Sequence, residues 1–448
     1  MALLDAAVLP EFSAISVADR RAWFALRLRP RLALAQRGVR IVLALDRSSS
    51  MTGQKFEHAR IAAMVVIQMM SDEDELAILT FDATVEVLLP PMRADAAGKR
   101  AAHGAILGLA VGEGTALYRA TQQSLALAEQ MGGGHAILLT DGFPFTGITD
   151  GEQILAMTAK GSTSATLTTI GVGSGLDAAL LAAMAGMGGG RFLHVDEGGY
   201  LPATLGAELT TVRGAVTGKI DFALRAAPGY SISAMPHYAS TRRASETPPL
   251  ATATLAPAVT NEEHLVPFEL AWTSDLALGE QQIGLITLAI GVRGSTEHEV
   301  LEVPVMLRVD AARGAMSAVV TCGVCEVVAG KVLHDAGVGE ESARRSVRRL
   351  GDAAAWIRGR ASAAGLDPER DLGPMLRVLG MARAAFEENE ADVPVLHACA
   401  AGIAKRYDAS VGSRSGLLGD LRSEAQSMGS DMGTNIGSRI EPIRPKQK

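Results

Sequence analysis

The sequence predicts an α/β protein in which a doubly wound, mainly parallel sheet is followed by an antiparallel β-sandwich and then by a helical region. Three observations support this prediction. Apolar strand-like runs alternate with helix-like segments from about residue 39 to 212. After Gly214, strand-like segments follow one another between turns, and from about Ala311 the pattern becomes helical. Alternating strands and helices are typical of a parallel sheet covered on both faces, whereas successive strands are typical of a sandwich.

The composition describes a globular chain of several domains. Of the 448 residues, 48% are hydrophobic and 20% are charged, which is not the balance of a disordered chain. A chain of this length is too long for a single hydrophobic core, so about two to four domains are expected. The net charge of −7, without a long basic face, argues against nucleic acid as the main partner.

Cysteine content and hydropathy argue against a disulfide framework and a membrane span. Cys322 and Cys325 have no second pair to complete a zinc site, and we interpret them as small residues on a buried helix. The N-terminus lacks the basic region of a signal peptide. The least charged long stretch, 314–330, contains Glu326 and is short for a membrane helix. We expect a cytoplasmic protein, and its oligomeric state does not follow from the sequence.

Strand and helix signals in the first half of the chain predict which segments form the α/β region. Residues 40–46 form an apolar run typical of a strand buried on both faces. Residues 75–82 and 84–90 follow each other so closely that they predict an antiparallel hairpin at one edge. Further strands are expected at 135–142, 165–173 and 191–195. The predicted helices cover 56–70, 95–109, 116–131, 150–160, 177–185 and 201–212.

The segments on either side of the α/β region predict that it is an insertion. Residues Trp23 to Leu34 have the pattern of a strand pair that folds back to join the later sandwich. The interval from Thr241 to Asn261, with three prolines, is predicted to be a loop. The predicted domains are an N-terminal segment with strands that join the sandwich (1–37), the α/β domain (38–212), the β-sandwich (213–310), a helical domain (311–410) and a Gly/Ser-rich tail (411–448).

Polar residues follow the predicted strands where the strands end. Asp46, Ser48 and Ser50 come after the first strand of the α/β region, Thr115 precedes a helix, and Asp141 comes after the buried strand at 135. The carboxyl ends of parallel strands meet at one edge of the sheet, where ligands bind. We therefore expect two carboxylates and three hydroxyls to lie together at this rim.

These three loops resemble those of a von Willebrand factor type A domain with a metal-ion-dependent adhesion site. The family signature is Asp-x-Ser-x-Ser after the first strand, a Thr in a second loop and an Asp in a third. Residues 46–51 (DRSSSM), 114–115 (GT) and 140–142 (TDG) match it in order, and the resemblance covers about residues 38–212. One departure is Ser49, which stands where the family more often has Gly. The sandwich and helices further resemble bacterial intracellular proteins that carry this domain.

The resemblance implies a divalent metal and an acidic partner. Ser48 and Ser50 would ligate the ion directly and Thr115 directly or through water, while Asp46 and Asp141 would act largely through bound waters. Mg²⁺ is the expected ion, with Mn²⁺ or Ca²⁺ as alternatives, because it prefers six oxygens and dehydrates reluctantly. A partner protein would supply a carboxylate to the remaining position. Arg47 and Glu113 flank the site, and we interpret them as partner-selecting residues.

Other interpretations of the same residues remain open. Ser50, Thr52 or Thr115 would each serve as a helix cap, and Asp141 before Gly as a turn residue. A Mg²⁺-dependent hydrolase of phosphoesters is the alternative function, although the sequence offers no evident base or nucleophile, and we assign no catalytic residue. In a third possibility, the C-terminal helices form an oligomer, and the metal domain is attached to its outside without taking part in the assembly. We expect a non-catalytic adaptor that binds proteins through its metal.

Overall fold

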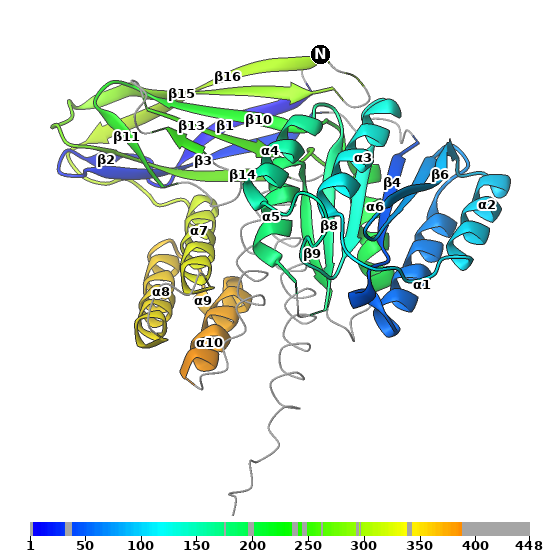
Figure 1. Cartoon of the computed structure of the whole chain (residues 1–448). Coiled ribbons are helices and arrows are strands. Elements are labelled where there is room, and N and C mark those ends of the chain that lie inside the picture. Colours follow the sequence, from blue (N-terminus) through cyan, green and yellow to red (C-terminus); the bar gives the residue numbers. More distant parts are fainter. Residues whose placement is uncertain are drawn as a thin grey trace, which may run out of the picture.

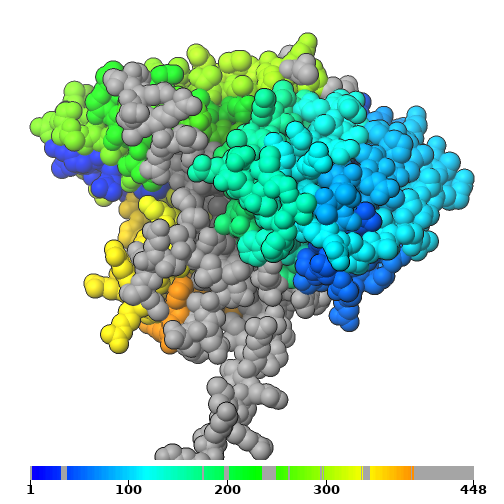
Figure 2. Space-filling view, viewed as in Figure 1, coloured from blue at the N-terminus to red at the C-terminus, as the bar shows by residue number. Residues whose placement is uncertain are grey.

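The computed structural model describes residues 3–387, apart from the internal gaps 32–37, 174–175, 196–200, 235–240, 244–248, 261–262, 293–294, 296 and 338–342. The chain forms one six-stranded α/β unit, two further β-sheets packed face to face, and a group of helices (Figure 1). Figure 2 shows the paired sheets along the top of the molecule, with the α/β unit at the right and the described helices of residues 318–387 below the sheets. The predicted fold class is confirmed.

The α/β unit is built on a sheet with strand order β6-β5-β4-β7-β8-β9. Neighbouring strands are parallel except for β5 and β6, so the predicted edge hairpin is present. Apolar runs make this sheet the centre of the unit, since every residue of β7 and β8 is buried. The strands are β4 (Arg40–Asp46), β5 (Glu75–Phe81), β6 (Val85–Arg93), β7 (His135–Thr140), β8 (Thr166–Val172) and β9 (Gly189–Val195).

Helices cover both faces of this sheet, and each face has its own apolar core. On one face lie α1 (Gln54–Met69), α2 (Ala96–Leu107) and α6 (Leu201–Gly214). On the other lie α3 (Leu117–Gln130), α4 (Gly151–Gly161) and α5 (Ala178–Met187). A short 3₁₀ helix, η1 (Ser49–Met51), precedes α1. The predicted order of strands and helices is therefore confirmed.

The two edges of the sheet face different surroundings. The amino ends of β4, β7 and β9 face the sandwich across a cavity of about 290 Å³. Arg40, His135 and Arg191 line it from the α/β sheet, and Thr217 and Pro257 line it from segments next to the sandwich strands. The carboxyl ends lie about 20 Å away, the length of a six-residue strand. The rim that carries the predicted metal loops therefore points away from the sandwich.

The sandwich combines strands from both sides of the α/β unit. One sheet has the order β1-β3-β14-β11, with β1 (Leu4–Pro10), β3 (Arg21–Pro30), β14 (His264–Trp272) and β11 (Tyr230–Ala234). The other has the order β12-β13-β10-β15-β16-β2, with β12 (Thr241–Arg243), β13 (Leu250–Leu255), β10 (Ile220–Ala226), β15 (Gly279–Gly291), β16 (His298–Asp310) and β2 (Ile15–Ser16). Their inner faces share one core, in which the rings of Phe24 and Phe268 stack with centroids 5.5 Å apart.

Pairing between β3 and β14 inserts the α/β unit into the sandwich. The register runs from Arg21 opposite Ala271 to Leu28 opposite His264, so the chain leaves the sandwich after β3 and returns at β10. The predicted strand pair between Trp23 and Leu34 has only its first half, β3, among the described residues. The antiparallel partner of β3 on its other side is β1, which lies upstream in the sequence.

The prediction of a loop between Thr241 and Asn261 is wrong. Residues 241–243 form β12 and residues 250–255 form β13, which pairs with β10. Small and apolar residues at alternate positions of β13, Ala251, Ala253 and Leu255, are buried in the sandwich core. The prolines are tolerated because Pro249 and Pro257 lie outside the strand, where no ladder hydrogen bond is lost.

The helices α7 (Ala318–Gly337), α8 (Ala343–Ala363), α9 (Pro368–Asp371) and α10 (Gly373–Glu387) follow the sandwich. Val320 and Val324 of α7 pack against Ala25 and Leu265, on the outer face of the sheet that contains β3 and β14. Cys322 and Cys325 lie on α7, and burial raises the pKa of the Cys322 thiol to about 12 and that of Cys325 still further. The remainder of the predicted helical domain, residues 388–410, and the tail 411–448 lie outside the described residues.

A buried carboxylate joins these helices to the sandwich. Glu11 is 1% exposed, and Nε of Arg360 on α8 donates to its Oε1 at 2.9 Å. The Arg360 guanidinium also lies 5.6 Å from the ring centroid of Phe12 and 5.3 Å from that of Trp356. Charge and ring contacts together fix α8 against the segment between β1 and β2.

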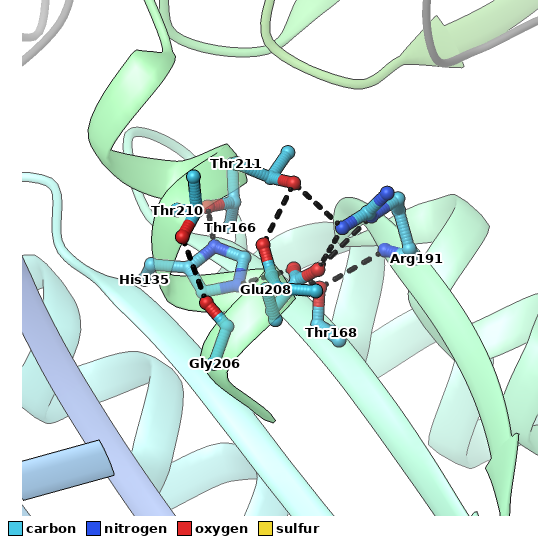
Figure 3. Close-up of polar contacts among 9 residues, drawn as sticks. His135, Thr166, Thr168, Arg191, Gly206, Glu208, Thr210 and Thr211 are labelled. Atoms are coloured by element: carbon cyan, nitrogen blue, oxygen red, sulfur yellow. Dashed lines mark hydrogen bonds and ion pairs between the residues drawn. The ribbon is translucent and has the colours of Figure 1, made fainter. Parts of the chain in front are cut away.

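A second buried carboxylate fixes α6 to the sheet (Figure 3). Glu208 is 1% exposed; Thr168 donates to its Oε1 at 2.6 Å, and Nε of Arg191 donates to its Oε2 at 3.0 Å. Nε2 of His135 lies 3.2 Å from Oε1. Burial alone would raise the pKa of Glu208, but the charges of Arg191 and His135 hold it well below its usual range. Glu208 is therefore ionised and connects α6 with β7, β8 and β9.

His264 lies in the sandwich core without a hydrogen bond to either ring nitrogen among the described residues. It is 1% exposed and stands on β14 opposite Leu28. Burial lowers its pKa to about 4 from the ordinary 6.5, because a charged imidazole would have no partner there.

Glu208→Ala is expected to destabilise the α/β unit by about 3 to 5 kcal/mol, because the buried ends of Arg191 and His135 lose their acceptor. Urea unfolding followed by circular dichroism measures this loss. Glu57→Ala is the matched control, since Glu57 pairs with Arg60 at a half-exposed site and should contribute below about 1 kcal/mol. Equal effects of both substitutions would contradict the assignment.

His264 predicts a loss of stability in acid. The unfolded chain binds a proton below about pH 6.5, whereas folded His264 does so only near pH 4, so the free energy of unfolding falls as the pH drops through this window. The total loss of unfolding free energy caused by this histidine between these two pH values is about 3 kcal/mol. His264→Leu should make the free energy of unfolding less dependent on pH between 6.5 and 4. Urea unfolding at several pH values measures this. Replacement of the exposed His298 by Leu is the control and should leave the pH dependence as in wild type.

Candidate metal centre

Asp46 is the last residue of β4 and its side chain is completely buried. Its Oδ1 accepts a hydrogen bond from the Ser48 N–H at 2.8 Å, and its Oδ2 accepts one from the Thr140 hydroxyl at 2.5 Å. Burial raises the pKa of Asp46 to about 6, although these hydrogen bonds act in the opposite direction and Asp141 adds to the increase. The carboxylate lacks a full counter-charge, which a bound cation would supply.

Three further side chains continue this arrangement toward the solvent. The hydroxyl oxygens of Ser48 and Ser50 lie 3.0 Å apart, and the Ser50 hydroxyl donates to Oδ1 of Asp141 at 2.7 Å. Ser48 and Asp141 are buried, whereas Ser50 is exposed. The first and third predicted loops therefore meet at a rim that is open at Ser50.

Helix capping does not explain the hydroxyls. Ser48 stands at the N-cap of η1 without a side-chain cap bond, and the N-cap of α1 is Gly53. The Thr52 hydroxyl instead donates to the carbonyl O of Ser49 at 2.6 Å. Ser49 begins η1, and since 3₁₀ helices use negative φ, the position does not require the glycine that is more usual in the resembled family.

Thr115 lies at the same rim. It is 2% exposed, and it does not cap α3, whose N-cap is Ala116. A Cβ atom built on Gly142 would lie 3.6 Å from the Ser50 hydroxyl oxygen and 3.8 Å from that of Thr115. The two hydroxyls thus approach the same point above Gly142, and the second loop joins the first and the third. The structure brings together all five predicted metal residues.

The donor set suits a hard divalent cation. Among the described residues, no group of three His, Cys, Asp or Glu side chains is placed to hold a metal, which leaves this mixed set of two carboxylates and three hydroxyls as the candidate. Oxygen ligands of this kind fit Mg²⁺, Mn²⁺ or Ca²⁺, and the incompletely compensated Asp46 favours a positive ion nearby. A bound ion would present an electrophilic position at the open side of the rim.

The α/β unit that carries this rim is similar to a known protein family. The family model of the von Willebrand factor type A domain matches residues 41–204. Residues 41–204 form a von Willebrand factor type A domain. The match includes every strand of the α/β sheet, apart from the first residue of β4, and all five rim residues.

Two solved structures resemble the chain beyond this vWA domain. One is a von Willebrand factor type A protein from Catenulispora acidiphila, with a TM-score of 0.67 and 17% identity over 84% of this chain and 89% of that one. The other is the ArnB paralog VWA2 from Sulfolobus acidocaldarius, with a TM-score of 0.57 and 14% identity over 91% and 98%. At these identities the likeness shows the fold alone. No curated protein sequence matches the chain, and none of its described helices could span a membrane.

Lys55 is a rim residue of the vWA domain that the sequence analysis did not identify. Its Nζ donates to Oδ2 of Asp141 at 2.8 Å, from the first turn of α1. A cation in the first turn opposes the helix dipole, which is only a weak sequence signal that the lysine has a partner elsewhere. Lys55 supplies part of the positive charge that the two carboxylates need.

The two predicted partner-selecting residues differ in their surroundings. Arg47 is largely buried and its Nη2 lies 3.1 Å from Oδ2 of Asp82 and 3.8 Å from Oε2 of Glu86. It therefore fixes the first loop against β5 and β6. Glu113 is exposed, and its carbonyl O accepts a hydrogen bond from Ala83 N at 2.7 Å. A role of either residue in partner choice stays a prediction.

Lys55→Met is expected to raise the affinity of the vWA domain for Mn²⁺ by roughly tenfold, because it removes a positive charge beside the ion. Isothermal titration calorimetry with Mn²⁺ measures the change. Lys160→Met removes an exposed lysine on α4, away from the rim, and should leave the affinity unchanged. A weaker affinity in Lys55→Met would indicate that Lys55 instead positions Asp141 for the ion.

Proposed function

We propose that this protein is a metal-dependent, non-catalytic protein-binding adaptor that captures an acidic residue of its partner through a divalent ion in the vWA domain. The observation that carries the proposal is the convergence of Asp46, Ser48, Ser50, Thr115 and Asp141 at one open rim. Mg²⁺ is the expected ion because hydroxyls and water satisfy its preference for oxygen ligands.

The charges at the rim favour an anionic partner group. The formal charges of Asp46, Asp141 and Lys55 sum to −1. A bound divalent ion would change this net charge to +1. Neutral hydroxyls next to the ion leave it electrophilic, so its open position attracts a carboxylate. Capture of Asp or Glu from another protein then places the ion in the interface.

The surroundings of the rim support binding without turnover. His135, at the start of β7, lies at the opposite edge of the sheet and pairs with Glu208. His194, near the end of β9, has its Nε2 2.7 Å from the carbonyl O of Gly173. Hydrolysis would require a base within hydrogen-bond reach of a metal-bound water, and the imidazole of His135 lies at the wrong edge of the sheet for that role.

Direct metal binding is the first test of this proposal. Asp46→Asn and Asp141→Asn should weaken Mn²⁺ binding roughly 10- to 100-fold in isothermal titration calorimetry. Ser49→Ala is the matched control, since it changes an exposed serine of the same loop that is not among the five rim residues. Equal Mn²⁺ affinity in wild type and both Asp variants would refute the metal site.

Partner capture is the second test. A pulldown from native lysate should retain a protein with wild type and Mg²⁺, and release it in EDTA or with Asp46→Asn. Peptide mapping of the retained protein should identify an Asp or Glu whose amidation abolishes binding. Metal-independent retention would contradict the adaptor role, and Mg²⁺-dependent turnover of a phosphoester panel that disappears in Asp141→Asn would favour the hydrolase.

A further inference from the structure

Next to the candidate metal centre, the third loop carries three exposed apolar side chains. Phe143, Phe145 and Ile148 are 46%, 74% and 39% exposed, and they follow Asp141 within seven residues. Phe145 has the largest exposed fraction among the exposed large hydrophobic residues of the described chain. Single exposed apolar residues are common on proteins, but three within seven residues of one loop are a candidate contact surface.

The loop holds these side chains in a defined place. The N–H groups of Phe145 and Thr146 both donate to the carbonyl O of Thr115 at 3.1 Å. Thr146 also packs closely on the second loop, since a Cβ built on Gly114 would lie 2.6 Å from its hydroxyl oxygen. The aromatic residues are therefore attached to the same backbone that carries the Thr115 side chain of the metal rim.

The charges around the loop restrict what it binds. Glu113, Asp150 and Glu152 are exposed beside it, so a run of acidic residues or an anionic lipid surface would be repelled. A divalent ion bound at the rim would offer a position for a single carboxylate. An uncharged apolar side chain next to that carboxylate meets the exposed phenylalanines without repulsion.

We infer that the partner segment carries one Asp or Glu with an aromatic or large aliphatic residue close to it in sequence. The inference rests on the proposed metal-dependent capture. The carboxylate binds the ion, and the apolar side chain packs on Phe143, Phe145 and Ile148. Phe143 and Phe145 follow Asp141 by two and four residues, at most about 14 Å of extended chain. The apolar residue of the partner therefore lies within about four residues of the acidic one.

Peptide display tests this inference with defined probes. Two phage libraries of twelve-residue peptides, one with a fixed central Glu and one with a fixed central Gln, are selected on the full chain in Mg²⁺. Wild type should enrich Phe, Trp, Leu, Ile or Met within four residues of Glu and disfavour additional acidic residues. Phe143→Ser/Phe145→Ser should lose the apolar preference and bind the enriched peptides at least about tenfold more weakly.

A matched control and the opposing outcomes complete the test. Val300→Ser, which changes a 65% exposed residue on β16 of the sandwich, should select the same peptides as wild type. No apolar enrichment by wild type, or unchanged enrichment by the double variant, would overturn the inference. A third outcome concerns the metal. If the apolar enrichment depends on the loop but is the same with a central Gln, in EDTA or with Asp46→Asn, both the metal-dependent capture and the paired motif are wrong. The loop would then be an apolar contact surface alone.

Discussion

The buried carboxylate of Asp46 is the constraint on which the metal rim depends. It ends a strand whose residues 41–45 are all apolar. Its two oxygens accept hydrogen bonds from the first loop through Ser48 and from the neighbouring strand through Thr140. These bonds fix the separation of the loops after β4 and β7, so Ser50 and Asp141 come within hydrogen-bond distance. Because burial raises the pKa of Asp46 to about 6, the folded chain holds a group whose ionised form is favoured by a cation.

The parts of this protein that are predictable from sequence share one property, which is that local pattern and topology agree. The apolar run at 40–46 and its alternation with helices specify a parallel sheet, and a parallel sheet brings its carboxyl ends together. Asp46, Thr115 and Asp141 can therefore be grouped from the order of the strands alone. Lys55 escapes such reasoning because its partner lies 86 residues away and its position on a helix gives only the weak signal of an unfavourable dipole.

The one wrong prediction and the features that the sequence does not reveal have an equally physical origin. Prolines suggest a loop between Thr241 and Asn261, but the short strand β13 fits between Pro249 and Pro257 and is specified by burial of alternate side chains, a tertiary effect. The sequence also does not indicate that Arg47 is fixed by Asp82 and Glu86 of the β5–β6 hairpin. Glu208 and His264 are unremarkable in sequence, since a charged or ionisable residue becomes informative only when its burial and its partners are known.

Insertion of the vWA domain between β3 and β10 has a consequence for synthesis of the chain. Leu28 pairs with His264, so β3 leaves the ribosome 236 residues before its partner, a delay on the order of 10 to 50 s at ordinary elongation rates. During that time β1 and β3 have open edges, and the vWA domain completes its own sheet from contiguous sequence. Arg27 and Arg29 alternate with the apolar residues of β3 and disfavour its pairing with other nascent chains. The same arginines that lie outside the finished core thus protect the strand before its sheet exists.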